Sequence, residues 1–498
     1  MTGTRAHPDT LPGVLEQTAR EHPTRPAVRD PRLTYPDLLD AAMTAAAGLI
    51  GLGVRPGESV GVWAPNGLPW ITASYGVLCA GARLVPLNTR YTAPEAADLI
   101  ARSGCRVVIA GGEGAGGRPL AELAAEAGAR LIVSPEELEG GPADRAETLR
   151  RMGALRPETV SHVQYTSGTT GRPKGALLRH GGLVETTRSW VRITGLRAGD
   201  VYPVVAPFAH IGGHKTGLLA CAVAGAALIP VPSLDPAALA RAVAARGVTF
   251  LQGPPALFRA LLAEPEMPRD AVRVAVTGAA VVPRDLIGAL RDRLGIRHVF
   301  TAYGLTEAGG VLTITRPDDP VGVVSETSGL PIPGTEVRID APDGPGEILV
   351  RGPGVMTGYL DDPAATAEAF SKGWLRTGDV GELDAAGRLR IVDRLKDIVI
   401  VGGLNVYPAE VEHVLTIAAG VRAAAVVGIP HARLGEVPAA FVVGGGPVEK
   451  IVARCAARLA AFKVPRTVWQ VDALPLTAAG KVDKAALRRA ALDRLDPP

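Results

Sequence analysis

The eleven residues from Tyr165 to Gly175, YTSGTTGRPKG, combine hydroxyls, glycines and a lysine directly after an apolar run. Glycines let backbone N–H groups approach an anion, hydroxyls donate to its oxygens, and Lys174 supplies positive charge. This composition predicts a loop that binds phosphate groups. The residues expected to take part are Thr166, Ser167, Gly168, Thr169, Thr170, Gly171 and Lys174.

The order of residues in this loop differs from that of the common P-loop. A P-loop places its lysine directly after the last glycine and follows it with Ser or Thr. Here Arg172 and Pro173 separate Gly171 from Lys174. An ATPase or kinase that releases ADP is therefore disfavoured. The alternative to a phosphate-binding loop is an ordinary surface turn of small residues.

Four further polar segments follow the loop in order along the chain. They are YGLTE at Tyr303–Glu307, TGD at Thr377–Asp379, DRLKD at Asp393–Asp397 and PLTAAGK at Pro475–Lys481. Together with the loop they resemble the successive motifs of the adenylate-forming superfamily of acyl-CoA synthetases, luciferases and carrier-loading adenylation domains. The five matches cover most of the chain, so the resemblance implies both the fold and the reaction class.

The resemblance implies a reaction in two steps. An acid attacks the α-phosphate of ATP to give acyl-AMP and pyrophosphate, and the acyl group then passes to a thiol. The first step brings two anions together, which demands Mg²⁺ and cationic side chains. By resemblance, Glu307 is the Mg²⁺ ligand, Thr306 holds the α-phosphate, and Lys481 is the catalytic lysine that bridges the attacking carboxylate and the α-phosphate.

The same resemblance assigns residues that bind the nucleotide. Tyr303 is expected along the adenine, and Asp379 is expected to accept from both ribose hydroxyls, with Arg394 beside it. The alternatives are an ordinary buried aromatic at Tyr303 and a turn carboxylate capping its own backbone at Asp379. The other expected contacts are Gly278, Ala279, Ala280, Thr301, Ala302 and Gly304.

A mobile C-terminal domain is also implied by the resemblance. It rotates between the two steps about a hinge at Lys396 or Asp397. Gly402 and Gly403 then approach the acyl-AMP, where missing side chains leave a passage for the pantetheine arm of coenzyme A. An ordinary hairpin turn is compatible with that role. Lys484 stands where many relatives have arginine, which leaves a phosphate contact at that position open.

The segment PFAHIGGHKTG is expected beside the acid. His210 resembles the gate next to the reacting carboxylate, and a loop histidine without a role is the alternative. Lys215 is expected either to meet a second polar group on the acid or to pair with a surface carboxylate, and it is not among the expected catalytic residues. Gly212, Gly213 and Gly217 are expected to leave room for a bulky ring.

The acid and its acceptor are inferred from the same resemblance. No residue here corresponds to the aspartate with which amino-acid adenylation domains hold an ammonium group, which favours a simple carboxylic acid. The local sequence is most similar to bacterial fatty-acyl and ring-bearing (steroid- or terpenoid-derived) acyl-CoA ligases, which implies a hydrophobic acid. The segments HARLGEVP and AFKVP resemble those of free-standing ligases, which implies coenzyme A as the acceptor.

Two other functions remain as alternatives. A stand-alone enzyme could load the acyl group onto an acyl carrier protein. A catalytically silent nucleotide-binding member could act through partner contacts, but the intact Lys481, Glu307 and Asp379 argue against it.

Composition excludes several classes of partner. The 498 residues include 53 Lys+Arg and 50 Asp+Glu, a formal net charge of +3, which gives no basis for binding nucleic acid or anionic membranes.

Four well-separated cysteines and no secretory signal pattern predict a cytoplasmic enzyme, and a homodimer is compatible with the sequence. The uncharged run from Thr216 to Leu234 predicts a helix and then a strand rather than a membrane span, because Pro230 and Pro232 interrupt it.

Short apolar runs that alternate with helical periodicity predict parallel βαβ units. The expected strands are Ser59–Trp63, Arg83–Leu87, Arg106–Ala110, Arg130–Val133, Thr249–Gln252, Val272–Thr277 and His298–Ala302. A helix is expected over Pro94–Arg102, since acids come early and arginine late. Ligands usually bind at the carboxyl ends of such strands. From about Gly329 to Arg390, short runs between Gly and Pro predict an antiparallel β subdomain.

The expected architecture is therefore α/β with two domains. Residues 1–393 form a large N-terminal domain of parallel-sheet αβα subdomains plus a small β-barrel-like subdomain, which binds ATP and the acid. Residues 394–498 form a small mobile α+β C-terminal domain that carries the catalytic lysine and the thioester-step loop.

Overall fold

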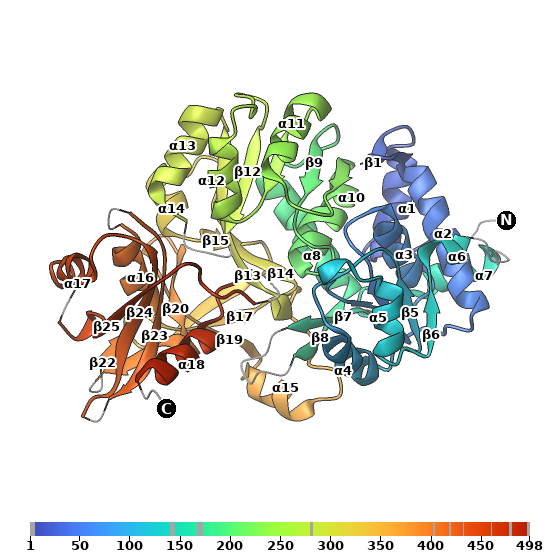
Figure 1. Cartoon of the computed structure of the whole chain (residues 1–498). Helices are drawn as coiled ribbons and strands as arrows, with labels where there is room; N and C mark the ends of the chain where they lie inside the picture. The colour runs from blue at the N-terminus through green and yellow to red at the C-terminus, as the bar shows by residue number, and fades with distance from the viewer. Residues whose placement is uncertain are drawn as a thin grey trace. The chain divides into compact units, whose positions relative to one another are not determined.

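A computed structural model describes residues 5–139, 145–166, 173–278, 282–401, 404–417, 420–431, 433–459, 461–477 and 481–495 (Figure 1). Contacts divide the chain into two compact units. The larger unit comprises Met1–Val337, Val350–Leu375 and Asp384–Leu389, and the smaller comprises Arg338–Leu349, Arg376–Leu383 and Arg390–Pro498.

A six-stranded sheet lies in the N-terminal part of the larger unit, with strand order β6-β5-β3-β4-β7-β8. Its strands are β3 (Ser59–Trp63), β4 (Arg83–Pro86), β5 (Val107–Ala110), β6 (Leu131–Val133), β7 (Val160–Thr166) and β8 (Lys174–Arg179). Strands β3 to β7 pair in parallel, and β8 runs antiparallel to β7. The four strands predicted in this region and their parallel pairing are confirmed.

Helices connect these strands, and their ends follow sequence signals. They are α1 (Leu11–Glu21), α2 (Tyr35–Gly51), α3 (Leu68–Cys79), α4 (Ala93–Ser103), α5 (Leu120–Glu126), α6 (Pro135–Glu139) and α7 (Arg145–Ala154), with a short turn η1 (Ala115–Gly117). Helix α4 begins with a capping box between Thr92 and Glu95, and it ends at Gly104 in the left-handed conformation. The helix predicted at this place is therefore confirmed.

A second sheet, in green to yellow in Figure 1, has strand order β11-β12-β13-β14-β15. Its strands are β11 (Phe250–Gln252), β12 (Val274–Gly278), β13 (His298–Leu305), β14 (Gly310–Ile314) and β15 (Leu330–Pro331). The first three are parallel, as predicted, and the last two are antiparallel. Its helices are α11 (Pro236–Arg246), α12 (Pro255–Ala263), α13 (Arg284–Leu294) and α14 (Val321–Glu326). Phe258, Ile287 and Val299 belong to the apolar core that forms between helices and sheet.

The uncharged run after residue 215 contributes to a third sheet of order β2-β1-β10-β9. The strands are β1 (Pro26–Arg29), β2 (Arg32–Thr34), β9 (Val201–Val204) and β10 (Ala227–Pro230), with α8 (His180–Thr194) before β9. The run itself forms a π-helix, η2 (His214–Leu219), then α10 (Ala220–Ala224) and β10, so the predicted helix and strand are confirmed. Across the described ranges, every helix is too short or too polar to cross a membrane.

Residues 329–390 form short strands, as their Gly- and Pro-rich sequence predicted. A five-stranded sheet has the order β16-β17-β19-β18, with β20 on β19. The strands are β16 (Glu336–Asp340), β17 (Gly346–Arg351), β18 (Phe370–Ser371), β19 (Trp374–Leu383) and β20 (Leu389–Arg394), with helix α15 (Pro363–Ala369) before β18. Strands β18 and β19 are antiparallel.

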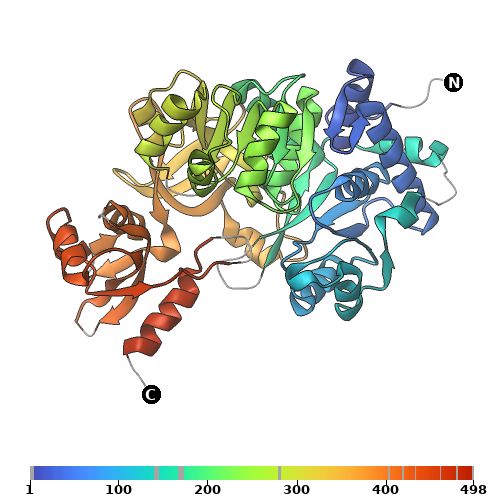
Figure 2. The same cartoon turned by 45° about the horizontal axis from the view of Figure 1, so that its top comes forward.

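The C-terminal part of the smaller unit is a sheet of order β22-β21-β24-β23 with β25 on β24. Its elements are β21 (Val399–Val401), β22 (Leu404–Val406), β23 (Val421–His431), β24 (Gly435–Gly444), β25 (Thr467–Val471), α16 (Pro408–Thr416), α17 (Val448–Ala456) and α18 (Lys484–Leu495). Figure 2 shows α18, in dark red, as the last helix before the C-terminus. Val426, Phe441 and Leu487 are buried in one core, which joins α18 to the sheet. The predicted α/β fold class is confirmed.

Candidate active site

The predicted phosphate-binding loop lies between two antiparallel strands of the larger unit. Strand β7 ends at Thr166 and β8 begins at Lys174, and these two residues are paired directly across the ladder. The hairpin therefore fixes Thr166 and Lys174 at the two ends of the loop. Their predicted companions Ser167, Gly168, Thr169, Thr170 and Gly171 lie outside the described residues.

Glu307, the predicted metal ligand, meets the end of this hairpin. Its Oε1 accepts hydrogen bonds from the Thr166 hydroxyl at 3.0 Å and from the Tyr359 hydroxyl at 3.2 Å. The backbone carbonyl of Glu307 accepts from Met356 N–H at 2.8 Å. Two motifs that lie about 140 residues apart in the sequence are thus joined through one carboxylate oxygen.

Tyr359 is a site residue that the sequence analysis missed. Its ring lies under the Lys174 ammonium, with 5.3 Å from Nζ to the ring centroid, while its hydroxyl reaches Glu307. Burial, and then the nearby Glu307 carboxylate, raise the pKa of Tyr359, so its phenol stays protonated and can donate. The neighbouring backbone pairs with β8, since Leu360 N–H donates to Gly175 O at 2.8 Å. A tyrosine in the sequence GYLDD, far from the other motifs, gave no signal of this placement.

The YGLTE motif spans the end of β13 and a short turn, η3 (Thr306–Ala308). A bulge between Tyr303 and Gly304 shifts the register against β14. A side chain at Gly304 would place its Cβ 1.7 Å from the Gly310 carbonyl oxygen, so glycine is needed there for the close approach of the two strands. Tyr303 is half-buried, and Thr306 and Glu307 follow it directly in the turn.

The other predicted nucleotide contacts lie where β12 and β13 run side by side. Gly278 is paired with Ala302, and a Cβ on Gly278 would lie 2.5 Å from the Ala302 carbonyl oxygen. The Thr301 hydroxyl donates to Val324 O at 2.6 Å, which commits its hydrogen to the fold rather than to a ligand. Ala279 and Ala280 lie outside the described residues.

His210, the predicted gate, lies at the start of a short helix, α9 (Ile211–Gly213). Its Nδ1 accepts a hydrogen bond from the Gly212 backbone N–H at 3.0 Å. Because Nδ1 is the acceptor, the proton of the neutral ring belongs on Nε2. The side chain is exposed, so it lies where a ligand can reach it.

Gly213 and Gly217 do not leave space for a ring, which corrects the expectation from the sequence for these two glycines. A Cβ on Gly213 would lie 2.2 Å from the Pro207 carbonyl oxygen, and one on Gly217 would lie 2.6 Å from Val204 Cγ1. A Cβ on Gly212 would lie 3.1 Å from His210 Nδ1. These glycines allow η2 and the turn before it to pack closely against Val204, at the end of β9, and against the Pro207 backbone.

A buried group of basic side chains follows the gate. His214 and Lys215 are 1% and 0% exposed, and the His214 ring packs against that of His162 with 4.5 Å between centroids. Burial lowers the pKa of His214 to about 3 and that of Lys215 to about 7, and it lowers the pKa of His162 as well. The predicted alternative for Lys215, a surface ion pair, is therefore wrong.

In the smaller unit, the TGD motif forms a braced turn. Gly378 has φ of +70°, and its N–H donates to Glu347 Oε1 at 3.1 Å. The Thr377 hydroxyl accepts from Asp379 N–H at 3.1 Å, so the backbone N–H of Asp379 is satisfied by Thr377. The Asp379 carboxylate meets Arg394 with 3.4 Å between Oδ1 and Nε, so the predicted pair is brought together.

Lys481, the predicted catalytic lysine, is exposed. Its backbone is held by Thr477, since Thr477 N–H donates to Lys481 O at 2.7 Å and Lys481 N–H donates to the Thr477 hydroxyl at 3.3 Å. Lys484 pairs with Glu412 at 2.9 Å, so its ammonium links α18 to α16. Gly402 and Gly403 lie outside the described residues, and the predicted hinge residues Lys396 and Asp397 lie in a short turn, η4 (Leu395–Asp397).

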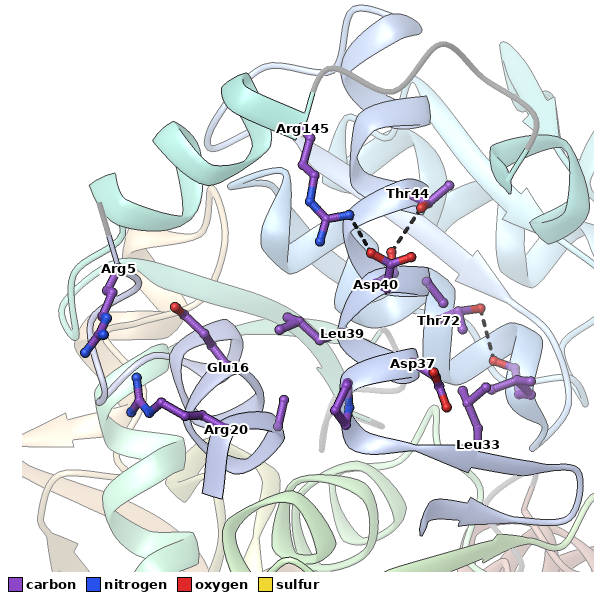
Figure 3. Close-up of a pocket in the computed structure, with 14 residues that line it drawn as sticks. Arg5, Glu16, Arg20, Leu33, Asp37, Leu39, Asp40, Thr44, Thr72 and Arg145 are labelled. Carbon is purple, nitrogen blue, oxygen red and sulfur yellow. Dashed lines mark hydrogen bonds and ion pairs between the residues drawn. The ribbon is translucent and has the colours of Figure 1, made fainter. Parts of the chain in front are cut away.

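A cavity of about 870 Å³ lies elsewhere in the larger unit, between α1, α2 and the start of α7. Figure 3 shows Arg5, Glu16 and Arg20 on one side of it, and the Arg145–Asp40 ion pair on the other. None of the described motif residues lines this cavity, so it is separate from the junction of Thr166, Glu307 and Tyr359.

The comparison with known families agrees with this geometry. The model of the AMP-binding enzyme family matches residues 15–360, and the model of the AMP-binding enzyme C-terminal domain matches residues 410–481. The chain belongs to the AMP-binding enzyme family. The first match contains the hairpin, Glu307 and Tyr359, and the second ends at Lys481.

Curated relatives of this family extend over nearly the whole chain. One is 3-[(3aS,4S,7aS)-7a-methyl-1,5-dioxo-octahydro-1H-inden-4-yl]propanoyl:CoA ligase from Mycobacterium tuberculosis, with 45% identity over 96% of this chain and 98% of the relative. The ligase of the same name from Rhodococcus jostii has 42% identity over 97% of this chain and 98% of its own length. The chain is accordingly an ATP-dependent, AMP-forming acyl-CoA synthetase that uses ATP and coenzyme A, as the sequence predicted.

Solved structures of AMP-binding enzymes have the same fold. The o-succinylbenzoate CoA synthetase of Bacillus subtilis, in complex with its acyl-adenylate intermediate, matches with a TM-score of 0.85 and 27% identity. The match covers 95% of this chain and 97% of that one. That structure therefore holds an acyl-adenylate on a fold that corresponds to this one over almost its entire length.

Proposed function

We propose that this enzyme joins a hydrophobic alicyclic carboxylic acid to coenzyme A through an acyl-AMP intermediate. The observation that carries the adenylation chemistry is the junction of the Thr166 hydroxyl, the Glu307 carboxylate and the Tyr359 hydroxyl beside Lys174. The acid class is supported by the relatives of 45% and 42% identity, whose names describe a bicyclic propanoic acid with two oxo groups.

Glu307 fits the role of a magnesium ligand. Both hydroxyls reach its Oε1, which turns the carboxylate to offer Oε2 to a cation. No cluster of three or more metal-ligating side chains occurs within the described ranges. That fits Mg²⁺, because this ion is commonly held by one or two carboxylates together with substrate phosphates. When bound, the ion would neutralise charge on the leaving pyrophosphate.

The residues of the larger unit would position the first step. Lys174 binds phosphate oxygens at one end of the hairpin, Thr166 at the other end holds the Glu307 carboxylate, and Thr306 donates to the α-phosphate. His210 offers Nε2–H to the carboxylate of the acid. An oxygen of that carboxylate then attacks the α-phosphorus, the bond to the bridging oxygen breaks, and pyrophosphate leaves with that electron pair.

The residues of the smaller unit would serve the nucleotide and the attacking group. Asp379, oriented by Arg394 and by the Thr377 brace, accepts from the ribose hydroxyls. Lys481 lies between the attacking carboxylate and the α-phosphate. Rotation at Lys396 or Asp397 then replaces Lys481 by the segment around Gly403, and the coenzyme A thiolate attacks the acyl carbonyl with AMP as the leaving group.

Transfer to an acyl carrier protein remains the second candidate for the last step. It differs from the proposal only in the acceptor.

We place the enzyme in the cytoplasm, where its four buried free cysteines are compatible with a reducing environment.

The test is product analysis with MgATP, coenzyme A and a panel of aliphatic, alicyclic and polycyclic acids. AMP, pyrophosphate and thioester are followed by mass spectrometry, and the expected result is AMP with an alicyclic acyl-CoA. Acyl-AMP without thioester, turning into an acyl-carrier conjugate when carrier protein is added, would favour the second candidate. Turnover of straight-chain acids alone would contradict the proposed acid class.

A further inference from the structure

The amine of Lys215 is a buried donor that the adenylation chemistry leaves unused. The side chain is 0% exposed, and its Nζ has no hydrogen-bond partner among the described residues. A buried polar group without a partner is costly, so proteins rarely keep one unless a ligand or an ordered water completes it. The structure therefore points to a missing acceptor at this position.

The place of Lys215 indicates which ligand supplies that acceptor. A Cβ built on Gly310 would lie 3.2 Å from Lys215 Cδ and 3.6 Å from its Nζ, and 3.7 Å from Ile211 Cγ1. Ile211 directly follows the His210 gate. Gly310 begins β14, three residues after Glu307, and is paired with Leu305 just before Thr306. The amine thus lies beside the segment that follows the adenylation motif, and Lys215 comes five residues after the His210 gate in the chain.

We propose that Lys215 is a specificity-determining residue that donates a hydrogen bond to a carbonyl oxygen on the carbon skeleton of the acid, away from its reacting carboxyl group. The inference rests on the proposed function, because it concerns the same acid. A ring ketone is the acceptor that suits an otherwise apolar substrate. It lets the acid bury its skeleton while the amine loses no hydrogen bond.

A neutral acceptor fits the surroundings of Lys215 better than a second carboxylate. Gly310, which lies close to the Lys215 amine, carries no side chain, and the ring of the adjacent His214 is neutral because burial lowers its pKa to about 3. Burial also lowers the pKa of Lys215 to about 7, so a neutral amine is available near that pH. A neutral amine can donate to a ketone without leaving an unbalanced charge in the interior.

The test compares two acids that share one bicyclic skeleton, one with a ring carbonyl and one with a methylene at that position. The wild-type enzyme should show kcat/KM about tenfold higher for the keto acid. Lys215→Met keeps the aliphatic stem and removes the donor. It should lower kcat/KM for the keto acid about tenfold or more, mainly through KM, and change that for the methylene acid less than about threefold.

Two controls separate recognition from folding. Lys450→Met removes an exposed lysine of the smaller unit and should leave both acids unaffected. The KM for ATP and the melting temperature of Lys215→Met report whether the variant keeps its nucleotide site and fold. The wild-type preference alone tests the proposal if that variant does not fold.

Each other outcome contradicts the proposal in a different way. Equal losses on both acids in a folded Lys215→Met enzyme would assign the lysine to packing. A wild-type enzyme without preference for the keto acid would exclude the hydrogen bond. A dicarboxylic acid of the same skeleton preferred over the keto acid would indicate an ion pair instead. Failure to turn over either bicyclic acid, while straight-chain acids react, would overturn the proposed function and this inference with it.

Discussion

Lys215 and Lys481 belong to two regions that differ in how far they bury a functional side chain. Lys215 lies in the interior of the larger unit, where its side chain is fully buried and its pKa is lowered to about 7 by that burial. Lys481 lies on an exposed segment of the smaller unit, held through its backbone by Thr477. The first lysine is fixed by the fold around it, whereas the second presents its side chain at the surface.

The difference in burial fits the two roles that we propose for these lysines. We propose that Lys481 meets a charged transition state and that its domain rotates, and an exposed segment suits both requirements. A residue that selects among acids benefits from burial, because a hydrogen bond lost in the interior costs more than one lost to water. Substitutions in the exposed region should therefore change activity without stability, and glycine substitutions in the packed region should do the reverse.

The largest expected effect comes from the exposed region. Lys481→Ala should lower the rate of acyl-AMP formation about 100- to 1000-fold, because we propose that its ammonium stabilises developing charge, while the melting temperature stays within about 1 °C. Pyrophosphate release with MgATP and the acid, without coenzyme A, measures the step.

Lys450→Ala is the matched control, since it removes an exposed lysine from the same unit. It should leave the rate unchanged. Similar losses in both variants, or a destabilised Lys481→Ala, would remove the contrast drawn between the two regions.

A glycine in the buried region should show the opposite pattern. Gly213→Ala would bring a Cβ within 2.2 Å of the Pro207 carbonyl oxygen. Because the neighbour is a backbone atom, relieving this clash requires a backbone shift that costs free energy. We expect a loss of about 1–3 kcal/mol in the free energy of unfolding. Chemical denaturation followed by fluorescence and circular dichroism measures it.

Gly288→Ala is the control for this change. It lies within α13, and the nearest group that a Cβ would meet among the described residues is the Asp292 carboxylate, at 4.0 Å. It should stabilise the protein by about 0.5–1 kcal/mol, as alanine does in a helix. If Gly213→Ala folded normally and instead excluded bulky acids, the original expectation that this glycine leaves room for a ring would be restored.

Much of the fold followed from local patterns in the sequence. The strands at Ser59–Trp63 and His298–Ala302 were predictable because apolar runs bounded by turns are read without long-range information, although the second strand continues to Leu305. Helix α4 was predictable from its early acids and late arginine. The motif residues were predictable because their order resembles a known family. Thr166 and Glu307 then met in space, which no local pattern specifies.

The parts that escaped prediction depend on contacts between distant segments. Gly213 looked like free space in the sequence, but the Pro207 backbone fills it. The burial of Lys215 could not be read from its charge, since a lysine between a histidine and a threonine is usually exposed. Tyr359 contacts Lys174 and Glu307 only because its segment adds to the edge of β8.

The smallest expected effect tests a residue that belongs to neither extreme. Tyr359 is half-buried, and its hydroxyl orients the Glu307 carboxylate while its ring supports Lys174. Tyr359→Phe keeps the ring and removes only the hydrogen bond, which is worth about 0.5–1.5 kcal/mol. We expect the rate of acyl-AMP formation to fall about three- to tenfold, with a raised magnesium requirement and little change in melting temperature. Titration of pyrophosphate release against Mg²⁺ measures both the rate and the magnesium requirement.

Tyr91→Phe removes a half-buried phenol outside the motifs and should change neither the rate nor the magnesium requirement. An unaltered magnesium requirement in Tyr359→Phe would show that Thr166 alone suffices to orient Glu307, so that the hairpin rather than the tyrosine positions the metal ligand.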